Sequence, residues 1–82
     1  METKTKETEI RELDELRAAY KLKVEEWILA IRVEEALATP DHTVHAVDVW
    51  EHAGFAEETA RNEAKEARKA YEDALRTVNF NF

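Results

Sequence analysis

The sequence predicts an all-α protein, an antiparallel two-helix hairpin that dimerises into a four-helix bundle. Apolar residues recur every three or four positions along most of the chain, as they do on one face of a helix. One glycine and one proline leave almost no turn chemistry for β-hairpins or phosphate-binding glycine loops. The proline, Pro40, lies near the middle of the 82 residues and divides this pattern into two helices of similar length.

The first helix is predicted over residues 4–38, where nothing in the sequence breaks a helix. Its apolar stripe falls within about 120° of arc on a helical wheel. The stripe consists of Ile10, Leu13, Leu16, Tyr20, Val24, Trp27, Ile28 and Ile31. Pro40 disfavours helical geometry at Thr39 and suits the first position of a second helix, which Thr39 can cap. The predicted link between the helices is therefore very short.

The second helix is predicted over residues 40–78, followed by a short aromatic tail at 79–82 within the same single domain, 1–82. Its stripe consists of Ala46, Val49, Ala53, Ala56, Ala60, Ala64, Ala67, Tyr71, Leu75 and Val78. An alanine recurs every seventh position from 46 to 74, which allows a bulky first helix to approach closely. Folding the chain about residues 39–40 pairs Tyr20 with Ala60, Leu16 with Ala64 and Leu13 with Ala67.

Gly54 leaves an alternative open, because a glycine inside a helix costs about 1 kcal/mol relative to alanine. A break there would give a three-helix bundle. The stripe stays in phase across Gly54, which favours one continuous helix.

Composition excludes several classes of function. The chain has no cysteine and no serine, so it lacks a thiolate or serine nucleophile, a disulfide and a cysteine zinc site. The net charge of −7 argues against direct nucleic-acid binding. No apolar run is long enough to cross a membrane, and we expect no signal peptide, because the first residues include no apolar stretch. We expect a cytoplasmic binding protein with no cofactor, not an enzyme.

The two ends of the predicted hairpin differ in charge. Residues 24–58, called the turn half below, hold nine acids and one base, whereas the remainder is nearly neutral. Three of these acids, Glu34, Glu35 and Glu51, are predicted to form an acidic rim. Apolar residues in or beside the turn half exceed what one seam can bury, and they form the predicted interface: Leu22, Leu29, Val33, Leu37, Val44, Val47, Trp50 and Phe55. A soluble monomer rarely exposes so much apolar surface.

These patterns predict a small acidic interaction module that binds a basic protein surface through its turn half. It would act as an inhibitor or adaptor, of the kind that small phage or mobile-element proteins supply. A homodimer would bury the surplus apolar residues; a different partner protein, or a third helix folding back after Gly54, would also do so. Trp27 and Trp50 serve either as core residues or as interface anchors. The aromatic tail either covers the open end near Ile10 and Tyr71 or docks in another protein.

The alternative function is a metal-binding helical bundle. Asp41, His45, Asp48 and His52 are spaced by four, three and four residues, which places them on one face of a helix. The Glu-x-x-His pattern of di-iron bundles is absent. Solvated polar side chains with ordinary contacts four residues apart explain the spacing better, so no metal site is predicted.

Overall fold

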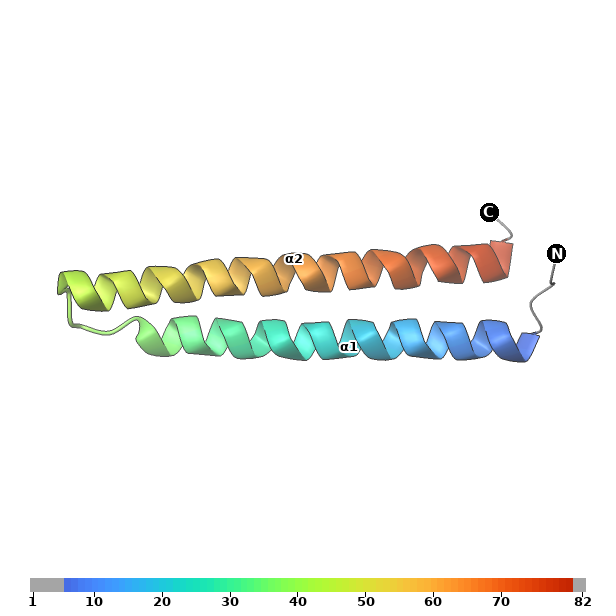
Figure 1. The fold of residues 1–82 in the computed structure, drawn as a ribbon, viewed down its shortest axis with the longest axis horizontal. Helices are drawn as coiled ribbons and strands as arrows, with labels where there is room; N and C mark the ends of the chain where they lie inside the picture. The colour runs from blue at the N-terminus through green and yellow to red at the C-terminus, as the bar shows by residue number, and fades with distance from the viewer. Residues whose placement is uncertain (1–5, 81–82) are drawn as a thin grey trace.

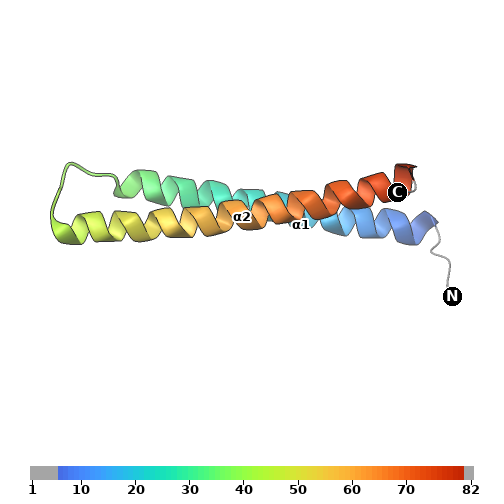
Figure 2. The same cartoon turned by 90° about the horizontal axis from the view of Figure 1, so that it is seen from above.

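The protein is a hairpin of two long helices, α1 (Lys6–Leu37) and α2 (Val44–Phe80), as a computed structural model shows (Figure 1). The structure describes residues 6–80, and no strand occurs among them. The helices lie side by side, cross at a shallow angle near the middle (Figure 2) and form a rod with extents of 61 × 19 × 18 Å. The predicted all-α hairpin is confirmed.

The link between the helices is longer than the sequence predicted, because residues 38–43 are not helical. α2 is capped by Thr43, whose Oγ1 accepts a hydrogen bond from the N–H of Ala46 at 3.2 Å. The N–H of Thr43 in turn donates to Oδ1 of Asp41 at 3.0 Å. These local side-chain bonds hold the backbone after Pro40 outside the helix. The prediction that Thr39 caps a helix beginning at Pro40 is therefore wrong.

α2 is continuous across Gly54, which confirms the prediction of one helix and excludes the three-helix alternative. Its end lies beyond the predicted one, since the helix continues through Asn79 to Phe80. Asn79 lies within the helix, and its side-chain Nδ2 donates to the carbonyl of Leu75 one turn earlier at 2.9 Å. Residues 4–5 of the predicted first helix and residues 81–82 of the predicted tail lie outside the described residues.

The seam between the helices follows a seven-residue repeat on both sides. In α1 a series of half-buried positions alternates by three and four residues: Leu13, Leu16, Tyr20, Lys23, Trp27, Ala30, Glu34 and Leu37. Val24 is half-buried beside this series. In α2 the matching positions are Ala46, Trp50, Ala53, Glu57, Ala60, Ala64, Ala67, Tyr71 and Ala74. Trp50 is the most exposed of these. This spacing is that of a coiled coil, with 3.5 residues per turn.

Part of each predicted stripe lies outside this seam. Ile10, Ile28, Ile31 and Val49 are exposed, as is Ala56. A stripe drawn with 3.6 residues per turn drifts by about 20° per seven residues from a seam that repeats every 3.5. Toward the end of α1 the predicted stripe therefore turns away from the seam. The seam there contains Ala30, Glu34 and Leu37 instead of Ile28 and Ile31.

The register also differs from the predicted one. Lys23 pairs with Glu63 at 3.2 Å, and Glu34 lies beside Gly54, so α1 meets positions six to eight residues further along α2 than predicted. The shift is close to one seven-residue repeat, so Tyr20 and Trp27 still face alanines, whereas Leu37 faces Trp50. At this register Tyr20 is level with Ala67 rather than with Ala60. The first turns of α2 extend beyond the end of α1 (Figure 1).

The hairpin has a thin core. Only Ala53 and Ala64, with 8% and 3% exposure, are buried among the described residues. No large side chain is fully buried in residues 6–80. The two helices alone therefore gain little of the 1.5–3 kcal/mol that full burial of a large apolar side chain would contribute.

Candidate functional site

Exposed apolar side chains concentrate toward the linker end of the rod. Ten of the thirteen large exposed ones lie between residues 22 and 55. These ten are Leu22, Ile28, Leu29, Ile31, Val33, Val44, Val47, Val49, Trp50 and Phe55. Of the eight predicted interface residues, seven are exposed, and Leu37 is half-buried at the last seam position of α1. Leu37 therefore belongs to the hairpin's own packing.

The exposed apolar residues occupy two separate sides of the hairpin. Leu22 and Leu29 are one repeat apart on the outer face of α1, and Val33 continues that face one turn later. Val47 and Gly54 flank the seam on another side, where helical spacing places them next to Trp50 on α2, and Ile31 flanks the seam on that same side from α1. In an antiparallel pair, equivalent flanking positions of the two helices meet on the same side of the seam. One partner helix therefore cannot cover both surfaces.

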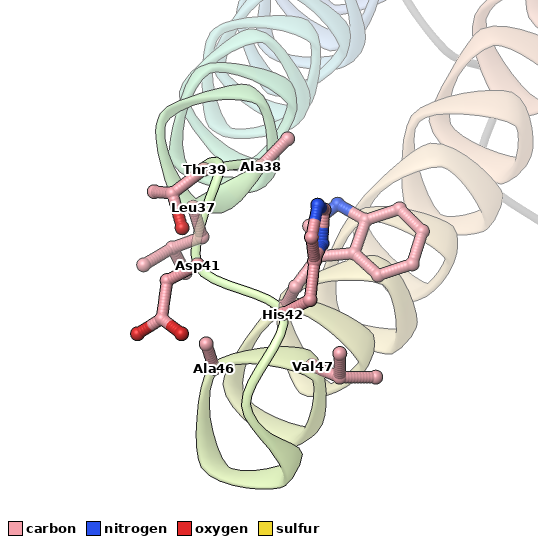
Figure 3. Close-up of a pocket in the computed structure, with 8 residues that line it drawn as sticks. Leu37, Ala38, Thr39, Asp41, His42, Ala46 and Val47 are labelled. Carbon is pink, nitrogen blue, oxygen red and sulfur yellow. The ribbon is translucent and has the colours of Figure 1, made fainter.

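The first turns of α2 extend past α1 and leave an apolar recess at the linker. At the register of the structure Leu37 is level with about Trp50, so residues 44–49 project by about 9 Å at 1.5 Å per residue. The recess, which we call the linker cavity, has a volume of about 300 Å³ (Figure 3). It is lined by Leu37, Ala38, Thr39, Asp41, His42, Ala46, Val47 and Trp50.

Figure 3 shows how the linker builds one wall of this cavity. Leu37 comes from the end of α1, Ala46 and Val47 from the first turns of α2, and Ala38, Thr39, Asp41 and His42 from the chain between them. The Asp41 carboxylate already accepts the Thr43 N–H. The inner surface offered to a ligand is therefore mainly apolar, contributed by Leu37, Ala46, Val47 and Trp50.

A second recess adjoins the first and shares Trp50 with it. This Gly54 cavity has a volume of about 160 Å³ and is lined by Glu34, Trp50, Glu51, Gly54 and Phe55. A Cβ atom at Gly54 would lie 3.6 Å from Oε1 of Glu34, so the missing side chain leaves space beneath that carboxylate. The carboxylates of Glu34 and Glu51 and the rings of Trp50 and Phe55 therefore surround the backbone of Gly54, which forms the floor of the cavity.

The predicted acidic rim lies partly in this cavity. Glu34 and Glu51 line it, whereas Glu35 is exposed and lines neither of the two cavities. None of the three has an ion-pair partner among the described residues. Sequence reasoning missed that Glu34 occupies a seam position and reaches Gly54. The 3.5-residue repeat that runs through Tyr20, Trp27 and Glu34 is the signal that would have found it.

Ion pairs concentrate toward the other end of the rod. Arg68 pairs with Glu72 at 3.0 Å, and Lys69 pairs with Asp73 at 2.8 Å. The hydrogen bond from Lys69 lowers the pKa of Asp73 and raises the pKa of the lysine itself. Hydrogen bonds to Glu26 and to Glu63 likewise raise the pKa of Lys23, which joins the two helices.

Three polar atoms are buried without a hydrogen-bond partner near the middle of the seam. They are Nε1 of Trp27, Oε2 of Glu57 and Nε of Arg61. At the register of the structure Trp27 is level with about Ala60, between Glu57 and Arg61. Trp27 is half-buried in the seam, whereas Trp50 is exposed and lines both cavities, so the two tryptophans lie in different environments.

The four metal-ligand candidates do not form one constellation. Asp41 precedes α2 and bonds the Thr43 N–H, so it leaves the helical face on which the spacing had placed it. Nδ1 of His52 lies 2.8 Å from the backbone carbonyl of Asp48. This contact leaves only the other ring nitrogen for a metal ion. The ring of His52 also meets Phe55 edge to face at 6.4 Å. Across residues 6–80 no group of three or more potential ligands could hold a metal ion.

Comparison with known proteins gives no relative. No family model matches the chain, and neither the curated proteins nor the solved structures contain a match. In the described part of the chain, neither helix has a stretch that is both long and apolar enough to cross a membrane.

Proposed function

We propose that this protein is a small acidic interaction module whose turn half binds a basic protein surface, in the manner of an inhibitor or adaptor rather than an enzyme. The thin core carries this proposal. The chain exposes 6791 Å² of surface, whereas a compact monomer of 9.5 kDa would expose about 5,000 Å². The excess, about 1,700 Å², is comparable to the area that a standard protein–protein interface buries in total.

The charge distribution supports a basic partner. The turn half has a net charge of −8 and the rest of the chain a net charge of +1. The rim acids Glu34, Glu35 and Glu51 form no ion pair with any other residue of the described range 6–80, so their charges are available to a partner. A carboxylate rim steers and orients a cationic partner, and the apolar side chains beside it contribute most of the affinity.

Self-association into a four-helix bundle is the second part of the proposal. The outer face of α1 supports it, since Leu22, Leu29 and Val33 are more than half exposed and lie on one helical face. Pairing this face with the same face of a second copy would bury the three side chains of both copies. The Gly54 side of the hairpin then stays open to a basic partner.

Light scattering tests the self-association. The wild-type chain is expected to have the mass of a dimer, and the variant with Leu29→Glu and Val33→Glu the mass of a monomer or an unfolded chain. A double variant with Lys21→Glu and Arg32→Glu, which alters charge on α1 without removing apolar surface, controls for added acidity. A monomer mass for the wild type would contradict the dimer, and an equal dimer mass with equal helicity in all three proteins would contradict burial of Leu29 and Val33 in it.

A matched pair of charge reversals tests the basic partner. In pull-downs from the host cell, the variant with lysine at positions 34, 35 and 51 is expected to capture much less partner than the wild type. The control variant carries Glu7→Lys, Glu15→Lys and Glu66→Lys, at positions that are exposed and form no ion pair within the part of the chain that the structure describes. Glu63 is unsuitable as a control, because its reversal would break the pair with Lys23.

Circular dichroism verifies that both variants keep the hairpin, since exposed charges contribute little to stability. Capture by the wild type is also expected to weaken with added salt, chiefly through slower association. The opposite ranking of the two variants would place the functional surface on the other end of the rod.

A further inference from the structure

We propose that the linker cavity and the Gly54 cavity together form a docking site for one basic amphipathic helix of a partner protein. An arginine side chain of that helix would occupy the Gly54 cavity, and a bulky apolar side chain would occupy the linker cavity. This inference rests on the proposed function and specifies which residues of the partner are recognised. Trp50 lines both cavities and would lie between the arginine and the apolar side chain of the partner helix.

The Gly54 cavity has the size and chemistry of a site for a cationic side chain. Its volume of about 160 Å³ is below the range of about 300–1,000 Å³ typical of small-molecule sites. Glu34 occupies a seam position, which places its carboxylate at the edge of the cavity. It has no ion-pair partner in residues 6–80. Glu51 lines the same cavity and has none either. The site therefore offers negative charge over an apolar floor.

Arginine fits this arrangement better than lysine. A planar guanidinium can bond two carboxylates at once and stack on an aromatic face, whereas an ammonium acts as a point charge. The rings of Trp50 and Phe55 supply such faces in the cavity lining. The absence of a side chain at Gly54 leaves room for the aliphatic stem beneath Glu34. These contacts together select a long, flat cation.

The linker cavity complements this cation with an apolar recess. Its larger volume, about 300 Å³, and its wall of Leu37, Val47 and Trp50 suit a leucine or an aromatic side chain. On α2 the two cavities are centred about one helical turn apart, around residues 47–50 and 51–54. A partner helix that carries its two anchors three or four residues apart would therefore reach both cavities.

Charge argues against a second copy of this chain as the occupant. A symmetric partner would bring its own turn half, with a net charge of −8, against the same carboxylates. Arg32 is the single Lys or Arg residue of that turn half, against nine acids, so a second copy would not neutralise Glu34 and Glu51. A basic helix supplies the opposite charge and the apolar anchor on one face.

Model peptides test the site directly. The probe is an alanine- and glutamine-based helical peptide of roughly 20 residues that carries one leucine and one arginine four positions apart, made in both orders. Binding to the ¹⁵N-labelled full chain is followed by the amide signal of Gly54 and the indole signal of Trp50. We expect saturable shifts confined to the residues that line the two cavities.

Three controls define the chemistry. Replacing the arginine by neutral citrulline is expected to weaken binding about tenfold, because charge-assisted hydrogen bonds are lost. Replacing the leucine by alanine is expected to weaken it by a similar factor. On the protein, Glu34→Gln with Glu51→Gln should reproduce the citrulline effect, whereas Glu7→Gln with Glu66→Gln should not.

Several results would overturn the inference. Equal affinity for the citrulline peptide would exclude an arginine site, and shifts spread over the other end of the rod would indicate nonspecific attraction. If the Gly54 and Trp50 signals depend on protein concentration without peptide, a second copy occupies the cavities. If the peptide does not bind but charge reversal at positions 34, 35 and 51 still abolishes partner capture, this inference fails and the proposed function stands.

Discussion

Replacing Gly54 by alanine is expected to stabilise the protein, because the structure leaves room for the added methyl group. The new Cβ would lie 3.6 Å from Oε1 and 4.0 Å from Cδ of Glu34, which is ordinary van der Waals contact. Glycine inside a helix is about 1 kcal/mol less favourable than alanine, and no clash offsets this gain. For a domain of this size, 1 kcal/mol corresponds to a rise of about 4–8 °C in Tm.

Thermal and urea unfolding monitored by circular dichroism measure this effect. Both proteins are compared at one concentration, since self-association would make Tm depend on it. The matched control is Ala56→Gly, an exposed position two residues further along α2, which should lower the stability by about 1 kcal/mol.

A loss of stability in Gly54→Ala would refute the argument. It would mean that α2 bends at Gly54 or that Glu34 cannot accommodate the methyl group. The same variant is expected to weaken arginine-peptide binding, because the methyl group fills the floor of the Gly54 cavity. Stability and binding should therefore change in opposite directions.

Three further perturbations test the fold. Thr43→Ala is expected to cost about 1 kcal/mol in urea unfolding through loss of the helix cap, whereas Thr39→Ala, at the cap position predicted from sequence, should change little. Ala64→Leu should cost about 1–3 kcal/mol by overpacking the most buried seam position, and Ala70→Leu at an exposed position is its control; stabilisation by Ala64→Leu would contradict the close seam. Because the pKa of Lys23 is raised, its contribution to stability is present below the ordinary value of 10.5 and is lost as pH rises through the raised value. Urea midpoints measured from about pH 9 to about pH 11.5 should therefore fall more steeply in the wild type than in Lys23→Met.

The secondary structure could be predicted from local information. A helix depends on residues three and four positions apart, so apolar periodicity and the single Pro40 were sufficient to predict two helices and their antiparallel packing. The uneven distribution of charge and of surplus apolar residues was also visible. The structure places most of those residues on the surface, as predicted.

The boundaries of the linker were less predictable, because they depend on competing local hydrogen bonds. Thr39 and Thr43 are both suitable helix caps by residue type. The bond from the Thr43 N–H to Asp41 and the bond from Ala46 to Thr43 favour the later start of α2. Pro40 permits a helix to begin but does not require it.

The sequence by itself determined that the two helices pair through small residues on α2, but the tertiary structure decided the register. An alanine at every seventh position from 46 to 74 makes pairings that differ by seven residues nearly equivalent in local packing. The observed pairing of Lys23 with Glu63 is one such choice. It leaves the first turns of α2 projecting beyond α1 and places Glu34 over Gly54. Both cavities exist because of this register, and contacts between distant residues, which periodicity does not encode, select it.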